Sequence, residues 1–283
     1  MSAYLIMRLV SPNFSDIAEP NIEMKKFPDG DNYTCLPEIK DGEVYLFHRL
    51  YPEQDSALMQ AFFMLDTLKR SGIKATLVSP YLPYSRQDKI FKKGEPLSAE
   101  IVCDLLSHSG AARLITVDCH FLKKEGTFKY GNLEIVNLSA KKLLVDYAKK
   151  LVGEIEVISP DMGANYLVAE FGGKSMKKVR GEYEKGEAAY RKIEKVEMDF
   201  DISGRNVLIL DDMISTGGTM IKAVENVKKG GAKKVLCAAT HGFFLKDSLQ
   251  KLKNLCDYVF VTDSIPSAVS SVSLKDLLFS HTR

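Results

Sequence analysis

Short apolar segments alternate with segments of helical periodicity along this chain of 283 residues, and no other feature constrains its fold as strongly. Apolar side chains recur at helical spacing over residues 55–70, and a short apolar strand follows at 75–79. The same pattern predicts strands at 114–117, 157–158, 207–210, 235–239 and 258–261, and helices at 98–106 with Ser98 as the cap, after Ser139, and at 219–229. Such alternation is typical of parallel α/β structure, because each helix returns the chain so that the next strand runs in the same direction.

Two of the expected strands resemble each other. Residues 114–118 and 207–211 are both apolar strands that end in an aspartate. The likeness suggests two similar halves, and the chain is long enough for two domains of ordinary size. We therefore expect an N-terminal domain at 1–139 and a C-terminal domain at 140–283.

Composition excludes several classes of function. The net charge is only +2, from 39 basic and 37 acidic side chains, so no global field favours nucleic acid or an acidic membrane. Five scattered cysteines, none in a Cys-x-x-Cys pair, argue against a disulfide framework or a structural zinc site. With no signal peptide and no apolar run of the ~20 residues that span a bilayer, a cytoplasmic protein is expected. The cysteines and His48, His108, His241 and His281 are interpreted as structural residues.

The strongest local signal begins at the strand 207–210 and ends in a helix. The strand delivers Asp211 and Asp212 to its C-terminal end, the edge where open α/β sheets bind ligands. Two glycines among hydroxyl residues follow, and their backbone amides, with the helix N-terminus, can hold a phosphate dianion. The two carboxylates would repel that phosphate but are good acceptors for neighbouring sugar hydroxyls. The segment therefore predicts a sugar-phosphate site made of Asp211, Asp212, Ser215, Thr216, Gly217, Gly218 and Thr219.

This segment resembles the phosphoribosyl-pyrophosphate motif that type I phosphoribosyltransferases share with ribose-phosphate pyrophosphokinases. Other segments are similar to the pyrophosphokinases specifically, and to their archaeal members. In chain order they are Lys26-Phe27-Pro28-Asp29-Gly30-Asp31, Tyr84-Ser85-Arg86-Gln87-Asp88-Lys89, Gly94-Glu95-Pro96-Leu97-Ser98, Asp118-Cys119-His120, Ser159-Pro160-Asp161-Met162-Gly163, Thr240-His241-Gly242-Phe243-Phe244 and Val261-Thr262-Asp263-Ser264-Ile265-Pro266. The resemblance implies two Rossmann-like α/β domains of phosphoribosyltransferase type I, with central parallel sheets.

The resemblance also implies an activity and a set of site residues. The activity is transfer of pyrophosphate from ATP to ribose 5-phosphate with Mg²⁺ as cofactor, in a homodimer or higher homo-oligomer whose ATP site lies at a subunit interface. ATP would bind to Phe27, Asp29, Gly30, Asp31, Arg86, Gln87 and Asp88, ribose 5-phosphate to 211–219, and Mg²⁺ to His120 and Asp161. Lys185, Arg86 and His120 would be catalytic, by stabilising charge during in-line transfer.

Three departures from the family pattern stand out. The charged segment 174–195 is the expected mobile flap, but the position of the family's flap arginine holds Glu187, with Arg180 and Arg191 nearby. Residues 11–23 leave little room for the helix usual before the Phe-x-Asp-Gly motif, and Asp31 replaces the usual Glu.

Two alternatives stay open. One is a regulatory or weakly active homologue that binds nucleotide and sugar phosphate but has lost turnover. The other is a phosphoribosyltransferase, which would explain only the 211–219 motif.

Overall fold

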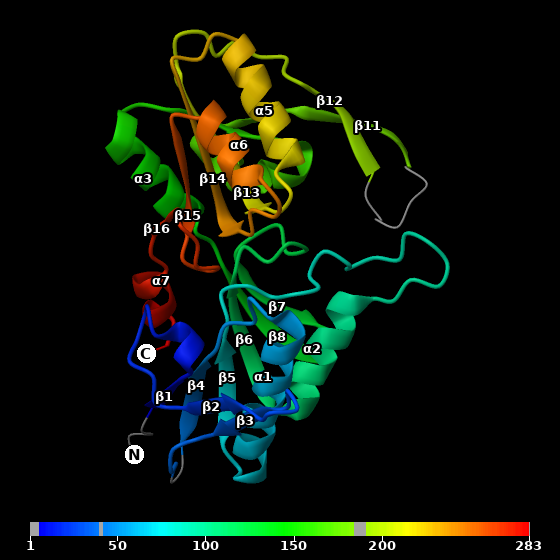
Figure 1. Cartoon of the computed structure of the whole chain (residues 1–283), viewed down its shortest axis with the longest axis vertical. Coiled ribbons are helices and arrows are strands. Elements are labelled where there is room, and N and C mark those ends of the chain that lie inside the picture. The colour runs from blue at the N-terminus through cyan, green and yellow to red at the C-terminus, as the bar shows by residue number, and fades with distance from the viewer. Residues whose placement is uncertain (1–5, 40–41, 184–190, 283) are drawn as a thin grey trace. The chain divides into compact units, whose positions relative to one another are not determined.

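The computed structural model describes residues 6–39, 42–183 and 191–282, and it divides into two compact units (Figure 1). The first unit contains Met1–Ser139 together with Leu274–Arg283, and the second contains Ala140–Ser273. The boundary between the two units therefore includes a break between residues 139 and 140. The last ten residues, which the sequence assigns to the second domain, instead pack with the first unit.

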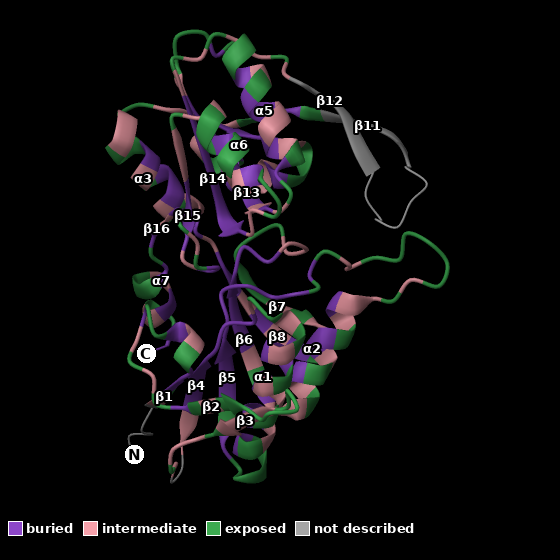
Figure 2. Ribbon diagram, viewed as in Figure 1, coloured by how far each residue is buried: buried purple, intermediate pink, exposed green. Residues whose placement is uncertain are grey.

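The first unit is built on a six-stranded sheet in the order β1-β4-β5-β6-β8-β7. All neighbouring strands are parallel except β7, which pairs antiparallel with β8 at one edge. The strands are β1 (Ile6–Val10), β4 (Glu43–Phe47), β5 (Lys74–Val78), β6 (Ala111–Val117), β7 (Gly126–Tyr130) and β8 (Leu133–Leu138). Helices α1 (Gln54–Arg70) and α2 (Ser98–Ser109) cover one face, and their apolar stripes form the main core with that face (Figure 2).

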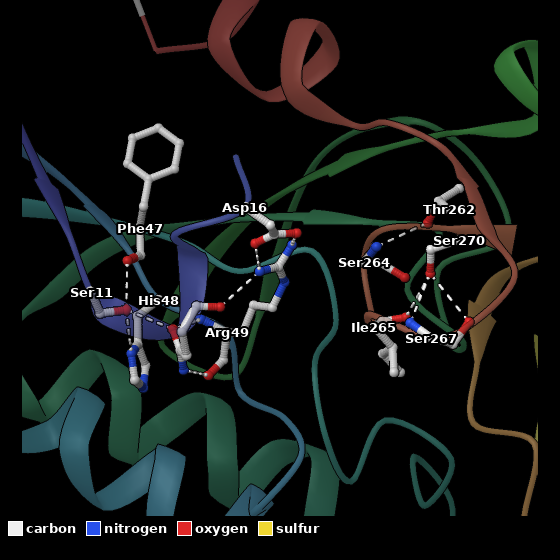
Figure 3. A network of polar contacts seen from close by, with 11 residues as sticks. Ser11, Asp16, Phe47, His48, Arg49, Thr262, Ser264, Ile265, Ser267 and Ser270 are labelled. Atoms are coloured by element: carbon white, nitrogen blue, oxygen red, sulfur yellow. Dashed lines mark hydrogen bonds and ion pairs between the residues drawn. The ribbon is translucent and has the colours of Figure 1, made fainter. Parts of the chain in front are cut away.

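The opposite face carries the short helix η1 (Pro12–Phe14) and the C-terminal helix α7 (Lys275–Ser280). Phe47 of β4 stacks on Phe279 with ring centroids 5.2 Å apart and meets Phe14 edge-on at 5.6 Å. Arg49 is only 2% exposed, and its guanidinium lies 4.5 Å from the Phe14 ring and pairs with both carboxylate oxygens of Asp16 (Figure 3). A buried arginine needs such a partner, because an unpaired buried charge is strongly destabilising. These contacts hold the loop after β1 and the C-terminus on the sheet.

The second unit contains a six-stranded sheet in the order β10-β9-β13-β14-β15-β16, in which every pair is parallel. Helices α3 (Lys141–Val152) and α4 (Asn165–Val168) pack on one face, and α5 (Gly218–Lys229) and α6 (Ser248–Leu255) on the other. The strands are β9 (Glu156–Ser159), β10 (Lys174–Ser175), β13 (Asn206–Ile214), β14 (Lys234–Gly242), β15 (Tyr258–Thr262) and β16 (Ser270–Val272). Near-continuous apolar strands such as β13 and β14 follow from burial on both faces.

Two antiparallel hairpins stand apart from the sheets. The first joins β2 (Glu23–Lys26) to β3 (Asn32–Cys35), and the second joins β11 (Lys177–Tyr183) to β12 (Arg191–Glu197). The second hairpin overlaps the expected flap segment 174–195 and ends two residues beyond it. The short helices η2 (Met162–Ala164) and η3 (Ala169–Phe171) complete the second unit.

The expected class, an α/β protein with two mainly parallel sheets, is confirmed, and so is the lack of a full helix at 11–23, where η1 spans three residues. All five cysteines are free thiols.

One local expectation was wrong: Ser98 does not cap α2. It is the first residue of that helix, and its hydroxyl donates to the side-chain oxygen of Gln87 at 3.0 Å. Within the described ranges, no helix combines the length and apolarity that crossing a bilayer requires.

His48 makes the stability of the first unit depend on pH. It is fully buried, with Nε2 3.0 Å from the Ala57 carbonyl and Nδ1 2.9 Å from the Ser11 hydroxyl (Figure 3). The carbonyl can only accept, so the neutral ring carries its proton on Nε2 and accepts at Nδ1. Burial lowers the pKa of His48 to about 4, from the ordinary histidine value of 6.5. As the pH falls below 6.5, the unfolded chain therefore takes up a proton before the folded chain does, and the folded state loses stability.

We expect the free energy of unfolding to fall by roughly 2 kcal/mol more between pH 7 and pH 5 in the wild-type chain than in His48→Gln. Urea titrations at both pH values measure the difference. His108→Gln, at the exposed C-terminal end of α2, is the control and should keep the wild-type dependence. Equal dependence in wild type and His48→Gln would show that His48 is not the responsible group.

Candidate active site

Three aspartates lie toward the C-terminal ends of two neighbouring strands of the second sheet. Asp211 and Asp212 lie near the C-terminal end of β13, and Asp161 follows the neighbouring strand β9. The Asp212 amide donates to Asp211 Oδ1 at 2.9 Å, and the Gly163 amide donates to Asp161 Oδ1 at 2.8 Å. Burial, and next the negative charges of Asp212 and Asp161, hold the pKa of Asp211 well above its ordinary value. Such a cluster favours a bound cation or hydroxyl donors over an anion.

The segment between these carboxylates and α5 has the geometry of an anion-binding loop. Gly217 stands before the first turn of α5 with φ +76°, a left-handed conformation that glycine adopts without strain. The first amides of a helix have no partner within it, and they point out of its N-terminus with the positive end of the helix dipole. Ser215 and Thr219 are half-buried, while Thr216 and Gly218 are exposed. The loop can therefore offer backbone amides and hydroxyls to a phosphate.

A second segment holds this loop in place, and sequence reasoning gave it no role. The amides of Phe243 and Phe244 donate to the Ile214 carbonyl, and the Leu245 amide donates to the Ser215 carbonyl at 2.9 Å. Phe244 and Lys246 both have positive φ, which is rare for residues other than glycine and persists only where the surroundings enforce it. Residue type does not predict these positive φ values, because neither residue is Gly, Asn or Asp. Phe244 does belong to one of the family-like segments.

The first unit contains the residues predicted for ATP. Arg86 is exposed and Gln87 and Asp88 are half-buried, in the segment that connects β5 to α2. The segment is anchored at both ends: the Gln87 amide donates to the Tyr84 carbonyl at 3.1 Å, and the Gln87 carbonyl accepts from the Ala99 amide. Tyr84 has φ +62° and its hydroxyl bonds to Asp55 at the start of α1. This bond raises the pKa of Tyr84.

A small open pocket of about 250 Å³ adjoins this segment, lined by Gln54, Asp55, Tyr81, Pro83 and Tyr84. Polar groups of α1 and aromatic rings before Arg86 share its wall. The ring of Tyr81 meets the ring of Tyr51 edge-on.

The β2–β3 hairpin presents the Phe-Pro-Asp-Gly motif at its tip. The Phe27 amide donates to the Asp31 carbonyl at 2.8 Å, the Gly30 amide donates back to the Phe27 carbonyl, and Gly30 has φ +98°. The Asp29 carboxylate accepts from the Asp31 amide. Phe27 is 52% exposed, with only an edge-on contact to Tyr33, so it is not a core residue. The turn therefore leaves the Phe27 ring exposed at the hairpin tip, where the sequence predicts a ligand.

The two residues predicted for Mg²⁺ lie in different units. His120 is half-buried directly after β6 in the first unit, two residues beyond the buried Asp118, whose φ is +42°. Asp161 lies in the second unit, directly after β9, the strand that pairs with β13. In the ranges that the structure describes, no three His, Cys, Asp or Glu side chains form a ready metal cluster. Carboxylate oxygens still fit Mg²⁺, which is often held by one or two carboxylates together with substrate phosphates. The predicted catalytic Lys185, and Glu187, lie outside the described residues.

Comparison with known proteins decides the family. A family model described as the N-terminal domain of ribose phosphate pyrophosphokinase matches residues 12–110, and a phosphoribosyl transferase domain model matches residues 164–276. The ribose-phosphate pyrophosphokinase of Pyrococcus furiosus is 36% identical over 258 residues, which cover 90% of this chain and 89% of the relative. That of Sulfolobus acidocaldarius is 33% identical over the whole chain and 94% of the relative. The chain belongs to the ribose-phosphate pyrophosphokinase family.

A solved structure supports the same assignment. The phosphoribosylpyrophosphate synthetase of Mycobacterium smegmatis superposes with a TM-score of 0.80 at 26% identity, over 98% of this chain and 97% of that one. The fold is therefore that of the ribose-phosphate pyrophosphokinases, with units of phosphoribosyltransferase type I. Within this family the chain is similar to archaeal members over most of its length.

Gly217 and Gly218 provide a matched pair for testing the loop geometry. A methyl group on Gly217 would lie 2.8 Å from Ser248 Cβ and would occupy a left-handed backbone, whereas one on Gly218 would meet nothing within 4 Å. We expect Gly217→Ala to lower the free energy of unfolding by about 1–3 kcal/mol. Gly218→Ala should leave it unchanged or slightly raised, because alanine is the better helix former. Urea denaturation of both variants measures this, and equal stabilities would contradict the described loop.

Proposed function

We propose that this member of the ribose-phosphate pyrophosphokinase family is an active ribose-phosphate diphosphokinase. The anomeric hydroxyl of ribose 5-phosphate attacks the β-phosphorus of ATP, a new O–P bond forms, and the bond between the α,β-bridging oxygen and the β-phosphorus breaks. The products are phosphoribosyl pyrophosphate and AMP. The observation that carries the proposal is the presence, at one edge of the second sheet, of an amide-rich loop beside Asp211 and Asp212. The loop amides suit a phosphate, and the two carboxylates suit sugar hydroxyls.

The second unit would bind the sugar phosphate. The amides and hydroxyls of the 215–219 loop hold the 5-phosphate at the N-terminus of α5. Asp211 and Asp212 accept hydrogen bonds from the vicinal ribose hydroxyls. These bonds offset the burial, and next the repulsion from neighbouring carboxylates, that raise the pKa of Asp211. The anomeric oxygen is thereby oriented for in-line attack, and orientation of this kind supplies much of the rate in phosphoryl transfer.

The first unit would bind ATP. Arg86 offers a planar fork of donors to triphosphate oxygens, and Gln87 and Asp88 lie next to it in the segment before α2. Phe27 with Asp29, Gly30 and Asp31 would bind the adenosine of ATP held by a second copy of the chain. The exposed position of Phe27 at the hairpin tip supports this arrangement, because a large apolar ring gains contact area there only from a partner or ligand. We therefore propose a homodimer or higher homo-oligomer that acts in the cytoplasm.

Charge neutralisation completes the proposed mechanism. Mg²⁺ would be held by Asp161 and His120 together with triphosphate oxygens, and when bound it would withdraw charge from the transferring group. Arg86, and Lys185 of the flap segment, would stabilise the negative charge that develops as AMP departs. The flap hairpin β11–β12 is the element suited to cover the site and exclude water, which competes as an acceptor.

One observation favours a second candidate function. Glu187 stands where the family has a flap arginine, and an acidic group near a triphosphate would oppose turnover. A regulatory homologue that binds both substrates without reaction would fit that substitution.

The complete mixture of Mg²⁺, ATP and ribose 5-phosphate should release AMP and an equal amount of phosphoribosyl pyrophosphate, and omission of any one component should abolish the release. Chromatographic quantification of both products measures this. Lys185→Ala should lower turnover by roughly a hundredfold or more at an unchanged Tm, whereas Lys150→Ala on the exposed face of α3 should leave it unaltered. Binding of both substrates without AMP would favour the regulatory homologue.

Asp211→Asn should separate the two substrates. Loss of the carboxylate weakens ribose 5-phosphate binding by about tenfold or more, while ATP affinity stays nearly constant. Because burial and neighbouring carboxylates raise the pKa of Asp211, the ionised group destabilises the folded state at neutral pH, so the amide should keep or raise the Tm. Calorimetric titration with each substrate and a thermal melt measure these effects. Asp146→Asn, exposed on α3, is the control. Unchanged affinities for both substrates would refute the loop assignment.

A further inference from the structure

Ser248, the first residue of α6, carries a buried hydroxyl for which the described residues supply no hydrogen-bond partner. The residue is only 1% exposed, so bulk water does not reach the hydroxyl. Buried polar groups in proteins are nearly always bonded, and one that is not destabilises the state that contains it. The hydroxyl is therefore expected to gain an acceptor in another state of the protein.

The position of Ser248 indicates which state that is. A methyl group built on Gly217 would lie 2.8 Å from Ser248 Cβ and 3.6 Å from its Oγ, so the serine packs directly against the phosphate loop. Gly217 precedes the first turn of α5 and Ser248 begins α6, and the two helices pack together (Figure 1). The N-termini of both helices therefore meet at this loop. Their dipoles and unbonded amides both favour an anion there.

The carbonyls of the loop identify an acceptor. The Ser215 carbonyl accepts from the Leu245 amide at 2.9 Å, and the Gly217 carbonyl accepts from the Ile221 amide at 2.8 Å. The carbonyl between them belongs to Thr216, and it shares a planar trans peptide with the Gly217 amide. In such a peptide the N–H and C=O point in opposite directions. If the Gly217 amide turns toward a bound phosphate, the Thr216 carbonyl must turn away from it and becomes available to a donor such as Ser248, which packs against Gly217.

We propose that Ser248 is a positioning residue of the sugar-phosphate site. When a phosphate dianion binds to the loop, the Ser248 hydroxyl donates to the Thr216 carbonyl and holds the Gly217 amide toward the phosphate. This inference rests on the proposed function, which supplies the phosphate of ribose 5-phosphate as the anion. Since the bond exists only in the bound state, it contributes to affinity and not to the stability of the free protein.

Ser248→Ala in the full chain tests the proposal. Calorimetric titration should show the Kd for ribose 5-phosphate raised about tenfold, which corresponds to about 1.4 kcal/mol, and a similar factor for inorganic phosphate. The urea midpoint of the free variant should stay the same or rise, because an unbonded polar group has been removed. Ser264→Ala is the matched control: that buried hydroxyl already donates to the Thr240 carbonyl at 2.7 Å, so its loss should lower the midpoint (Figure 3 shows Ser264).

Any other outcome would either overturn the role proposed for Ser248 or show that this role and the proposed function do not stand or fall together. An unchanged Kd in Ser248→Ala overturns it, and so does a fall in the urea midpoint or failure to fold, because either shows that the hydroxyl is already bonded in the free protein. If the wild-type chain binds inorganic phosphate but not ribose 5-phosphate, the proposed function fails and the phosphate titrations still decide the role of Ser248. Binding of neither probe overturns both.

Discussion

The candidate site of the second unit depends on the hydrogen-bond ladder between β13 and β14. The ladder continues past the apolar part of β13 through both aspartates, with Asp211 opposite Ala239 and Met213 opposite His241. This register fixes the backbone positions of the two aspartates at the edge of the sheet. Burial and proximity then raise the pKa of Asp211. The carboxylates at this edge of the second sheet are therefore held in an unfavourable electrostatic environment, which hydrogen bonds from sugar hydroxyls or a bound cation would relieve. Functional sites often contain groups held in this way.

The loop at 215–219, proposed to bind phosphate, is held by long-range contacts as well as by its own glycine. Gly217 is required because its backbone is left-handed and because Ser248 packs against it. The segment after β14 adds backbone bonds to Ile214 and Ser215 and adopts positive φ at Phe244 and Lys246 to do so. A loop held in this way keeps its amides in place before a ligand arrives, which reduces the entropy lost on binding.

In the first unit, long-range contacts fix the short segment between β1 and β2. The segment between β1 and β2 contains only η1, a helix of three residues. Arg49, which follows β4, pairs with Asp16 and lies over the Phe14 ring, and so holds this segment. The Phe47–Phe279 stack then joins the C-terminal helix to the same face of the sheet. Much of the unit therefore depends on contacts between residues far apart in sequence.

Hydrophobic periodicity predicted about half of the sheet strands, namely β5, β6, β9, β13, β14 and β15, and the main helices α1, α2, α3 and α5. It did not predict the remaining strands of either sheet, which are short or lie near the sheet edges. The predicted strand 207–210 and helix 219–229 correspond to β13 and α5, because burial on both faces of a strand and on one face of a helix leaves a local pattern. The carboxylate pair and glycine loop were also visible in sequence, since strand ends and glycine turns are local features. The family motifs added the ATP segment around Arg86.

Tertiary structure alone decided which partners the polar groups found. The Ser98 hydroxyl binds Gln87 in place of capping its helix, and residues 274–283 return to the first unit. Neither the burial of Arg49 nor the contact of Ser248 with Gly217 follows from any local pattern. The physical reason is that periodicity records only which side of an element is buried. Which distant residue completes a hydrogen bond or fills a space depends on how the assembled chain packs.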